Sequence, residues 1–234
     1  MIMLGLIPAR RGSKGISGKN IRPLGDFPLV EYTLRAATAA KRLDVVAVTT
    51  NDPKVAQIAS QFKVRVIDRP ESMARDESPM IDAVAHALEI LAGQGCRPDA
   101  VTLLQPTSPF RTAEHIDQAV LQFCESGADS LLSVNAVSEH PCECVRREDG
   151  RLNRAVDPPS PGSGRQAFPE YWYVNGAIYI TRTSMLLDKR EFWDAKSEIF
   201  IMPSLNSLDI DGPSDWILAE ALLKIHFDSI GLVR

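Results

Sequence analysis

Residues 3–20 read MLGLIPARRGSKGISGKN, and this stretch decides the fold. It opens with the apolar run Met3–Ile7, which is typical of a buried parallel strand. The run leads directly into a loop rich in glycine and in cationic side chains. Open α/β sheets bind their ligands at the carboxyl ends of such strands. The stretch therefore predicts an α/β protein whose first strand ends in a ligand site.

Strand and helix patterns alternate along the chain after this loop. Short apolar or β-branched runs predict further buried strands at Val45–Thr50, Val64–Ile67, Ala100–Leu104 and Ser130–Val134. Apolar residues at helical spacing lie between these runs: Leu29, Leu34 and Ala37; Ala83, Ala87, Leu88 and Leu91; Ile116, Val120 and Phe123. The last of these helices has a capping residue at Thr112 and a stop signal at Gly127. This alternation predicts a doubly wound, mostly parallel α/β sheet.

The alternation then stops. Residues 136–175 are punctuated by Pro and Gly, include DPPSPGSGRQ and have no clear period, so we interpret them as an inserted arm. Regular structure is expected to resume over Ala177–Thr181 and Phe200–Asp211, before a helix that begins at Pro213. The sequence thus predicts a single domain over residues 1–234, with the arm inserted in it.

Composition and charge narrow the class of protein. With 44% hydrophobic and 24% charged residues, the chain can bury an ordinary core. Its net charge of -4 is spread along the sequence, which argues against nucleic acid as a partner. No apolar stretch is long enough to span a bilayer, and the first apolar run is too short and wrongly flanked for a signal peptide. We expect a cytoplasmic protein with no membrane partner.

The cysteines do not form a recognisable metal motif. Cys96 and Cys124 stand alone, and only Cys142 and Cys144 are close in sequence, without CxxC spacing. A metal site at this pair would need His140 and a distant fourth ligand. Free thiols are therefore the expected state.

The first loop has the composition of a phosphate site. It combines cations with glycines: Arg10, Arg11, Lys14 and Lys19 with Gly12, Gly15 and Gly18. Glycines let backbone amides face an anion, and the cations neutralise phosphate charge. Ser13 and Asn20 break the P-loop pattern, and the even glycine spacing breaks GxGxxG. We expect a triphosphate here. The alternative is a solvated basic turn, in which the clustered cations would repel one another.

A carboxylate pair stands near the other end of the chain, in SLDIDGPSDW. Asp209 and Asp211 occupy positions i and i+2 of the expected strand end, so their side chains project from one face. Paired oxygen ligands suit Mg²⁺, which binds through one or two carboxylates together with substrate phosphates. The alternative for Asp211 is a cap on the helix at Pro213, a role that leaves Asp209 unexplained. The two ends of the chain therefore predict complementary halves of one metal nucleotide site.

Five motifs follow one another along nearly the whole chain: IPARRGSKGISGKNIRPL, DRPESMARDES, LLQPTSPFRTAEHI, RQAFPEYWYVNGAIYI and SLDID. In this order and at similar spacing they resemble the acylneuraminate cytidylyltransferases, also called CMP-sialic acid synthetases. The resemblance implies a fold like that of the nucleotide-diphospho-sugar transferases, with a dimerisation arm at about 136–175. It also implies CTP and a sialic-acid-type sugar as substrates, Mg²⁺ as cofactor and a homodimer.

Carried over by position, the resemblance assigns two sets of substrate contacts. Those to the CTP phosphates and the rest of the nucleotide are Arg10, Ser13, Lys19, Asn20, Arg69 and Ser78. Those along the sugar are Gln105, Asn175 and Tyr179. A tyrosine at strand spacing is also typical of a core residue, so this alternative stays open for Tyr179. Asp209 and Asp211 hold Mg²⁺ in this comparison.

The arm carries a third set of residues. In the family it mediates dimerisation and lends residues to the partner's site, which here implies Arg165 and Gln166. An arginine suits the sugar carboxylate through paired hydrogen bonds, and the alternative is a solvated loop arginine. One departure from the family is Glu143 in HPCECV, where relatives that use sialic acid often carry a lysine. The identity of the sugar acid therefore stays open.

The implied reaction joins CMP to a nine-carbon 2-keto sugar acid, such as N-acetylneuraminic, legionaminic or pseudaminic acid. The anomeric hydroxyl attacks the α-phosphorus of CTP, and pyrophosphate leaves. Arg10 and Lys19 would stabilise the pyrophosphate, while Asp209 or Asp211 is a candidate to take the hydroxyl proton. The alternatives are a CMP-KDO-type synthetase for another sugar acid and a catalytically silent nucleotide-binding scaffold. The presence of both aspartates argues against the scaffold.

Overall fold

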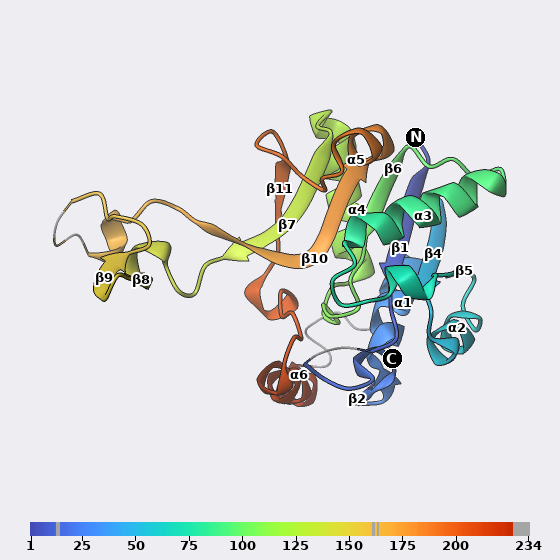
Figure 1. The fold of residues 1–234 in the computed structure, drawn as a ribbon, viewed down its shortest axis with the longest axis horizontal. Helices are drawn as coiled ribbons and strands as arrows, with labels where there is room; N and C mark the ends of the chain where they lie inside the picture. The colour runs from blue at the N-terminus through green and yellow to red at the C-terminus, as the bar shows by residue number, and fades with distance from the viewer. Residues whose placement is uncertain (13–14, 161, 163, 227–234) are drawn as a thin grey trace.

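The computed structural model describes residues 1–12, 15–160, 162 and 164–226. Its main sheet has seven strands in the order β11-β7-β10-β6-β1-β4-β5 (Figure 1). These strands are β1 (Met3–Pro8), β4 (Val45–Thr50), β5 (Arg65–Asp68), β6 (Ala100–Leu103), β7 (Ser130–Ala136), β10 (Trp172–Arg182) and β11 (Glu198–Ile201). β10 runs antiparallel between β6 and β7, and the other pairs are parallel. The mostly parallel α/β sheet that the sequence predicts is thus confirmed.

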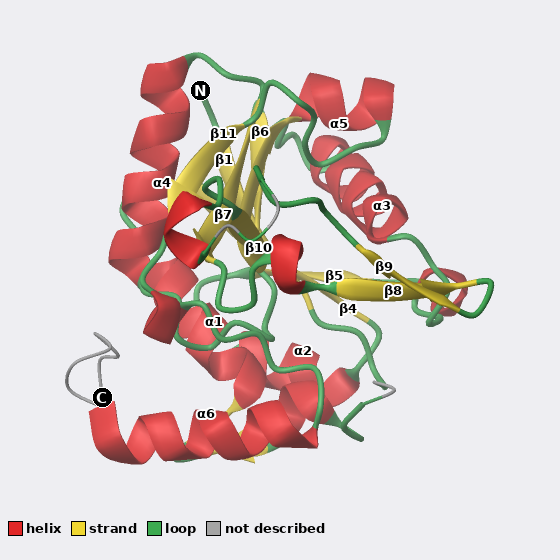
Figure 2. Cartoon of the chain, turned by 90° about the vertical axis from the view of Figure 1, so that its left-hand side faces the viewer, coloured by secondary structure: helices red, strands yellow, loops and turns green. Residues whose placement is uncertain are grey.

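Helices cover both faces of this sheet, with α4 and α3 on opposite sides (Figure 2). One layer contains α1 (Leu29–Ala39), α2 (Pro53–Ala59) and α4 (Ala113–Ser126), and the other contains α3 (Met80–Gly93) and α5 (Thr183–Lys189). The alternation of side chains along β1 serves both layers. Met3 and Ile7 join the first core cluster, whereas Leu4 and Leu6 join the second. Because both faces are buried, the strand reads as a continuous apolar run.

Two helix boundaries follow the capping signals in the sequence. Thr112 Oγ1 accepts a hydrogen bond from His115 N at 3.2 Å at the start of α4, and Gly127 ends the helix with a left-handed φ of 69°. The C-terminal helix α6 (Pro213–His226) begins at Pro213. Among the residues that the structure describes, no helix is both long and apolar enough to cross a membrane.

The prediction of regular structure over Phe200–Asp211 is wrong beyond its first residues. β11 ends at Ile201, and Met202 N still donates a hydrogen bond to Val134 O at 2.8 Å. Pro203 then has no N–H with which to continue the ladder, so the chain leaves the edge of the sheet.

The two aspartates therefore do not lie on a strand. After a short 3-10 helix, η5 (Ser204–Asn206), the chain runs through an irregular stretch that contains both of them. Ile210 between them is fully buried, whereas Asp209 is partly buried and Asp211 is exposed. The prediction that Asp209 and Asp211 occupy a strand end is therefore wrong.

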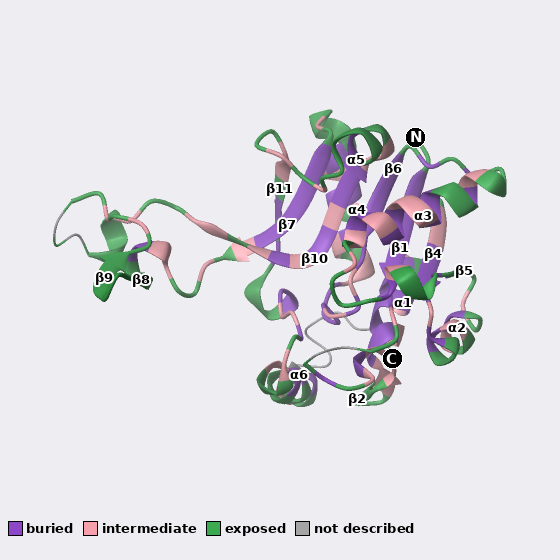
Figure 3. Ribbon diagram, viewed as in Figure 1, coloured by how far each residue is buried: buried purple, intermediate pink, exposed green. Residues whose placement is uncertain are grey.

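The segment between β7 and β10 forms an arm that projects from the sheet (Figure 1). It contains the antiparallel hairpin of β8 (Val145–Glu148) and β9 (Arg151–Arg154), whose residues are exposed (Figure 3). The ring of His140 lies 4.7 Å from that of Phe168 and 5.1 Å from that of Tyr171. These contacts join the outgoing and returning chains of the arm.

Candidate active site

Lys19 joins the two ends of the chain. It begins the short 3-10 helix η1 (Lys19–Ile21) after the first loop, and it is only 8% exposed. Its Nζ donates a hydrogen bond to Ile210 O at 2.7 Å and lies 3.5 Å from Asp211 Oδ1. The basic loop and the aspartate segment, which the sequence separates by nearly its whole length, thus meet in one place. A cation beside a carboxylate pair is the arrangement that a metal nucleotide site needs.

Gly15 lets the loop lie directly against the aspartate segment. A β-carbon built on Gly15 would lie 2.0 Å from Asp211 O, closer than any side chain can approach. The next residue, Ile16, enters an apolar cluster with Ile210 and with Trp216 of α6. Burial of apolar surface stabilises this contact by about 25 cal/mol per Å². The loop and the segment are therefore fixed against each other by packing as well as by Lys19.

Asp209 is the more enclosed of the two carboxylates. Its Oδ1 is buried and has no hydrogen-bond partner among the described residues. Burial raises the pKa of Asp209, although a hydrogen bond from Thr107 lowers it. The charge of Asp211 raises this pKa as well, and the charge of Lys19 lowers it. Ile210 N donates to Thr107 O at 2.8 Å, which holds the segment on the loop after β6. Asp209 Oδ1, the buried oxygen without a hydrogen-bond donor among the described residues, can receive a cation.

A third acid, Asp215, caps helix α6. Its Oδ2 accepts hydrogen bonds from Asp211 N at 2.9 Å and from Gly212 N at 2.8 Å. Asp215 thus binds, from inside the first turn of α6, the amides that precede the helix, and Asp211 contributes its backbone N–H to this contact. The side chain of Asp211 is 80% exposed and can face a ligand.

Gln105 and Tyr179 line a pocket of about 750 Å³. A β-carbon on Gly176 would lie 3.8 Å from Asp209 Oδ2 and 4.0 Å from Gln105 Nε2, so the three residues surround one point. Burial raises the pKa of Tyr179, and the charge of Asp209 adds to the shift. Gln105, which lines the pocket, therefore lies close to Asp209 across Gly176.

Phe192 and Trp193 also line this pocket, and the sequence reasoning missed both. The remaining lining residues are Met80, Leu103, Glu191, Asp194 and Ala195. They lie in the loop between α5 and β11, and the Phe192 ring centroid is 6.1 Å from that of Tyr179. Aromatic side chains beside an amide such as Gln105 give the mixed lining that is typical of a small-molecule site. The only signal in the sequence was an aromatic pair inside the otherwise polar stretch REFWDAKS.

Arg10 and Arg69 form a second cationic group, near the segment after β5. Arg10 makes an ion pair with Asp76 at 2.5 Å and donates to Ala74 O at 3.2 Å. Arg69 is 3% exposed and donates to Thr49 O at 3.0 Å. Burial, together with the charge of Arg10, lowers the pKa of Arg69 to about 10. Arg69 therefore remains cationic at neutral pH and can attract an anion.

The other residues predicted to bind the nucleotide are held by nearby backbone. Asn20 Nδ2 donates to Arg10 O at 3.0 Å, which ties the end of the first loop to its start. Ser78 Oγ donates to Ser72 O at 3.1 Å. Ser13 lies outside the described residues. The described members of this set thus gather around the first loop and the segment after β5.

Asn175 is buried in the sheet instead of facing the pocket. It is 1% exposed, and its Oδ1 accepts hydrogen bonds from Ser133 Oγ at 2.6 Å and Ala177 N at 3.1 Å. Its Nδ2 donates to Ser207 Oγ at 2.9 Å. These bonds hold β10 where its register is irregular. Asn175 therefore helps to fix its neighbours in the sheet, and the structure does not place it along the sugar pocket.

Replacing Asn175 by Ala is expected to lower the free energy of unfolding by roughly 2 kcal/mol, because Ser133 Oγ and Ala177 N lose a buried acceptor. Urea unfolding followed by circular dichroism measures this change. The control is Gln118→Ala, an exposed residue on α4, which should change stability by less than about 0.5 kcal/mol. A loss for Asn175→Ala as small as that of the control would contradict the role assigned to these bonds.

Arg165 and Gln166 lie on the arm, in the 3-10 turn η4 (Arg165–Ala167), and both are exposed. Arg165 contacts Glu143 through two bonds, with Nε to Oε1 at 2.9 Å and Nη2 to Oε2 at 2.7 Å. The hydrogen bond from Arg165 lowers the pKa of Glu143. Glu143 is the residue that departs from the family pattern. It therefore pairs with Arg165, the arginine that the family resemblance assigns to the sugar carboxylate.

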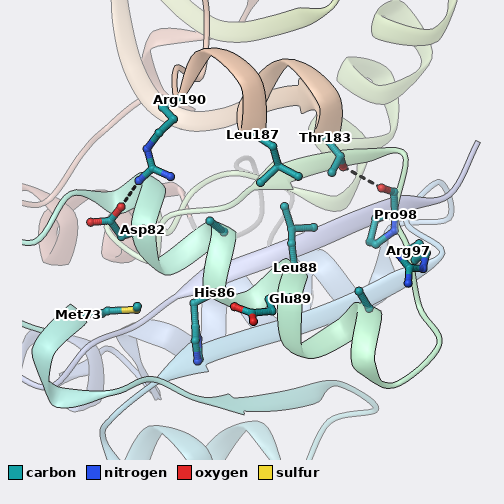
Figure 4. Close-up of a pocket in the computed structure, with 12 residues that line it drawn as sticks. Met73, Asp82, His86, Leu88, Glu89, Arg97, Pro98, Thr183, Leu187 and Arg190 are labelled. Atoms are coloured by element: carbon teal, nitrogen blue, oxygen red, sulfur yellow. Dashed lines mark hydrogen bonds and ion pairs between the residues drawn. The ribbon is translucent and has the colours of Figure 1, made fainter.

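A second pocket of about 500 Å³ lies between α3 and α5 (Figure 4). Arg190 and Asp82 form an ion pair at one end, and Thr183 Oγ1 donates to Pro98 O at 2.8 Å at the other. None of the residues predicted to bind substrate lines this pocket. The residues predicted to bind the nucleotide lie instead around the first loop and the segment after β5, and Gln105 and Tyr179 line the other pocket.

The first loop lies at the carboxyl edge of an open α/β sheet, where such folds bind their ligands, and Lys19 joins the aspartate segment to it. The structure resembles CMP:2-keto-3-deoxy-manno-octonic acid synthetase complexed with CTP, with a TM-score of 0.70 at 18% identity over 96% of this chain and 99% of the other. It also resembles 4-diphosphocytidyl-2C-methyl-D-erythritol synthase, with a TM-score of 0.70 at 16% identity over 95% and 98% of the two chains. At such low identities these likenesses concern the fold. A family model described as cytidylyltransferase matches residues 4–188, and the chain belongs to that family.

Two curated relatives extend the match beyond the family model. The CMP-N,N'-diacetyllegionaminic acid synthase of Legionella pneumophila is 31% identical over 98% of this chain and 100% of its own length. The N-acylneuraminate cytidylyltransferase of Escherichia coli is 33% identical over 93% of this chain, which spans 51% of that longer protein.

Proposed function

We propose that this chain transfers CMP from CTP to the anomeric hydroxyl of a nine-carbon 2-keto sugar acid and releases pyrophosphate. The relatives support this substrate class, because one is named for a legionaminic acid and another for N-acylneuraminate. The observation that carries the proposal is the contact of Lys19 with Ile210 O and Asp211. In this contact the ammonium of Lys19, which can bind a phosphate, lies beside the carboxylate of Asp211, which can bind a metal.

Two substrates can share this site without competing. CTP would lie along the first loop, with its phosphates on Arg10 and Lys19 and the rest of the nucleotide near Arg69. The sugar acid would occupy the pocket of about 750 Å³ beside Gln105 and Tyr179. This division presents the anomeric hydroxyl to the α-phosphorus near the carboxylates, and such an orientation removes much of the entropic barrier.

The two aspartates suit Mg²⁺. Asp209 offers a buried oxygen without a hydrogen-bond partner among the described residues, and Asp211 offers an exposed carboxylate. The described residues contain no group of three or more His, Cys, Asp or Glu that could hold a metal, so phosphate oxygens and water would complete the coordination. When bound, Mg²⁺ would neutralise charge on the phosphates. Lys19 and Arg10 would stabilise the leaving pyrophosphate, and one of the aspartates would take the hydroxyl proton.

We further propose that the chain works as a cytoplasmic homodimer in which each arm reaches the partner's site. Arg165 has a 68% exposed side chain, and Glu143 orients its guanidinium. The hairpin of the arm exposes two apolar side chains, Val145 and Leu152. Clustered exposed apolar residues favour contact with another protein surface. Sedimentation equilibrium at several concentrations tests the assembly, and a monomer throughout would contradict it.

A panel of sugar acids tests the reaction. The protein is incubated with CTP, Mg²⁺ and N-acetylneuraminic, legionaminic or pseudaminic acid or KDO, and the CMP conjugate is detected by mass spectrometry alongside pyrophosphate. We expect a conjugate with at least one nine-carbon acid, and its loss when EDTA removes the metal. A product with KDO alone would establish the alternative substrate class. Binding of CTP without any conjugate would support the silent scaffold.

A further inference from the structure

Arg111 is the largest of the fully buried side chains, and it carries a charge. It lies in the loop between β6 and α4 and is 1% exposed. Burial lowers the pKa of Arg111 to about 9, so the guanidinium remains cationic at neutral pH. Within the described part of the chain, its hydrogen bonds go to uncharged oxygens and no carboxylate pairs with it. Burying an unpaired charge is costly, so its presence calls for a specific role.

The guanidinium of Arg111 bridges three elements. Its Nη1 donates to Ala177 O of β10 at 2.6 Å and to Gln105 O, just beyond the end of β6, at 3.2 Å. Its Nη2 donates to Thr33 Oγ1 of α1 at 2.8 Å. A planar fork of donors can satisfy such divergent acceptors at once, which a lysine ammonium cannot do with the same geometry.

One of these acceptors belongs to Gln105, which lines the candidate sugar pocket, and a second belongs to Ala177 on β10, the strand that also carries the pocket residue Tyr179. Gln105 lines the pocket with its side chain, and its carbonyl is the one that Arg111 binds. Ala177 follows Gly176, whose φ of +72° marks the irregular turn in β10. A β-carbon on Gly176 would contact both Gln105 Nε2 and Asp209 Oδ2, at 4.0 and 3.8 Å. Arg111 therefore ties the carbonyl of Gln105 to that of Ala177, and so links Gln105 to the strand that carries Tyr179.

We propose that Arg111 is a positioning residue for the transfer, because it links Gln105 to the strand that carries Tyr179, and both residues line the candidate pocket for the sugar acid. The inference rests on the proposed function and adds that Arg111 affects binding of the sugar acid but not binding of CTP. The predicted nucleotide contacts, Arg10 and Lys19, have other partners in the fold. Loss of the Arg111 contacts therefore weakens productive binding of the sugar and leaves binding of CTP unchanged.

Arg111→Lys tests this role with the charge preserved. We expect the KM for the sugar acid to rise about tenfold or more and kcat to fall, while the KM for CTP stays within about twofold of the wild-type value. Thr33→Val is the matched control, because it removes only the bond to α1. It should lower the melting temperature while the KM for the sugar acid changes by less than about threefold.

A double-mutant cycle with Gln105→Ala separates positioning from general destabilisation. If Arg111 acts through Gln105, Arg111→Lys should reduce kcat/KM for the sugar acid much less in the Gln105→Ala background than in the wild type. Additive losses would overturn the inference. An unchanged KM for the sugar acid, equal defects for both substrates, or failure of Arg111→Lys to fold would overturn it as well. The wild-type chain is measured first, so the absence of any CMP conjugate would count against the proposed function itself.

Discussion

Asp209→Asn is expected to lower kcat by roughly 1,000-fold, because an amide lacks the charge with which the carboxylate would bind Mg²⁺ and balance the phosphates. The same change should not weaken the fold. Burial raises the pKa of Asp209, which means that folding favours its neutral form. At neutral pH the ionised carboxylate therefore opposes folding, and a neutral amide removes that cost. We expect the variant to be less active and at least as stable. Pyrophosphate release and urea unfolding measure the two effects.

Asp215→Asn is the matched control for this prediction. It removes a carboxylate from the same segment, but the asparagine side chain can still accept the amide hydrogen bonds from Asp211 and Gly212. We expect kcat to stay within about threefold of the wild-type value. Equal losses of activity in Asp209→Asn and Asp215→Asn would mean that local charge alone matters. This outcome would contradict the proposal that the carboxylate of Asp209 has a specific role in binding Mg²⁺.

The parts of the fold that the sequence predicts are those governed by local rules. Apolar runs identify β1 and β4 because strands buried on both faces need no polar positions, and Thr112 and Gly127 bound a helix through capping. The meeting of the first loop with the aspartate segment was also within reach. A loop after a central parallel strand must lie at the carboxyl edge, and Lys19 contacts Asp211 there.

The missed features depend on contacts that sequence spacing does not encode. Pro203 ends a strand that would otherwise read through to the aspartates. Arg111 looks like an ordinary surface cation, and only the convergence of β6, β10 and α1 buries it. Asn175 matches the sugar motif by position, yet the fold uses both groups of its amide internally. The pairing of Arg165 with Glu143 likewise follows from the path of the arm.

Gly15→Ala is expected to lower kcat/KM by about 100-fold, even though the new side chain is a single methyl group, because a displacement of about 1 Å at reacting groups can cost that much. The added β-carbon would lie 2.0 Å from Asp211 O. The β-carbon is bonded directly to Cα and the oxygen belongs to the backbone, so no side-chain rotation relieves the clash. Either the loop or the aspartate segment must move. Lys19 then loses its bond to Ile210 O, and the cation and the carboxylates no longer face one another. Steady-state kinetics with CTP and the preferred sugar acid measure the loss.

Gly127→Ala shows whether that loss comes from geometry or from reduced stability. Gly127 ends α4 with a φ of +69°, and among the described residues no atom would lie within 4 Å of an added β-carbon. The left-handed conformation makes the alanine cost roughly 1–2 kcal/mol of stability, far from the candidate site. We expect its kcat/KM to stay within about twofold of the wild-type value. If Gly15→Ala were no less active than Gly127→Ala, the close contact between loop and aspartate segment would have no part in the chemistry. The proposal built on Lys19 would then lose its main support.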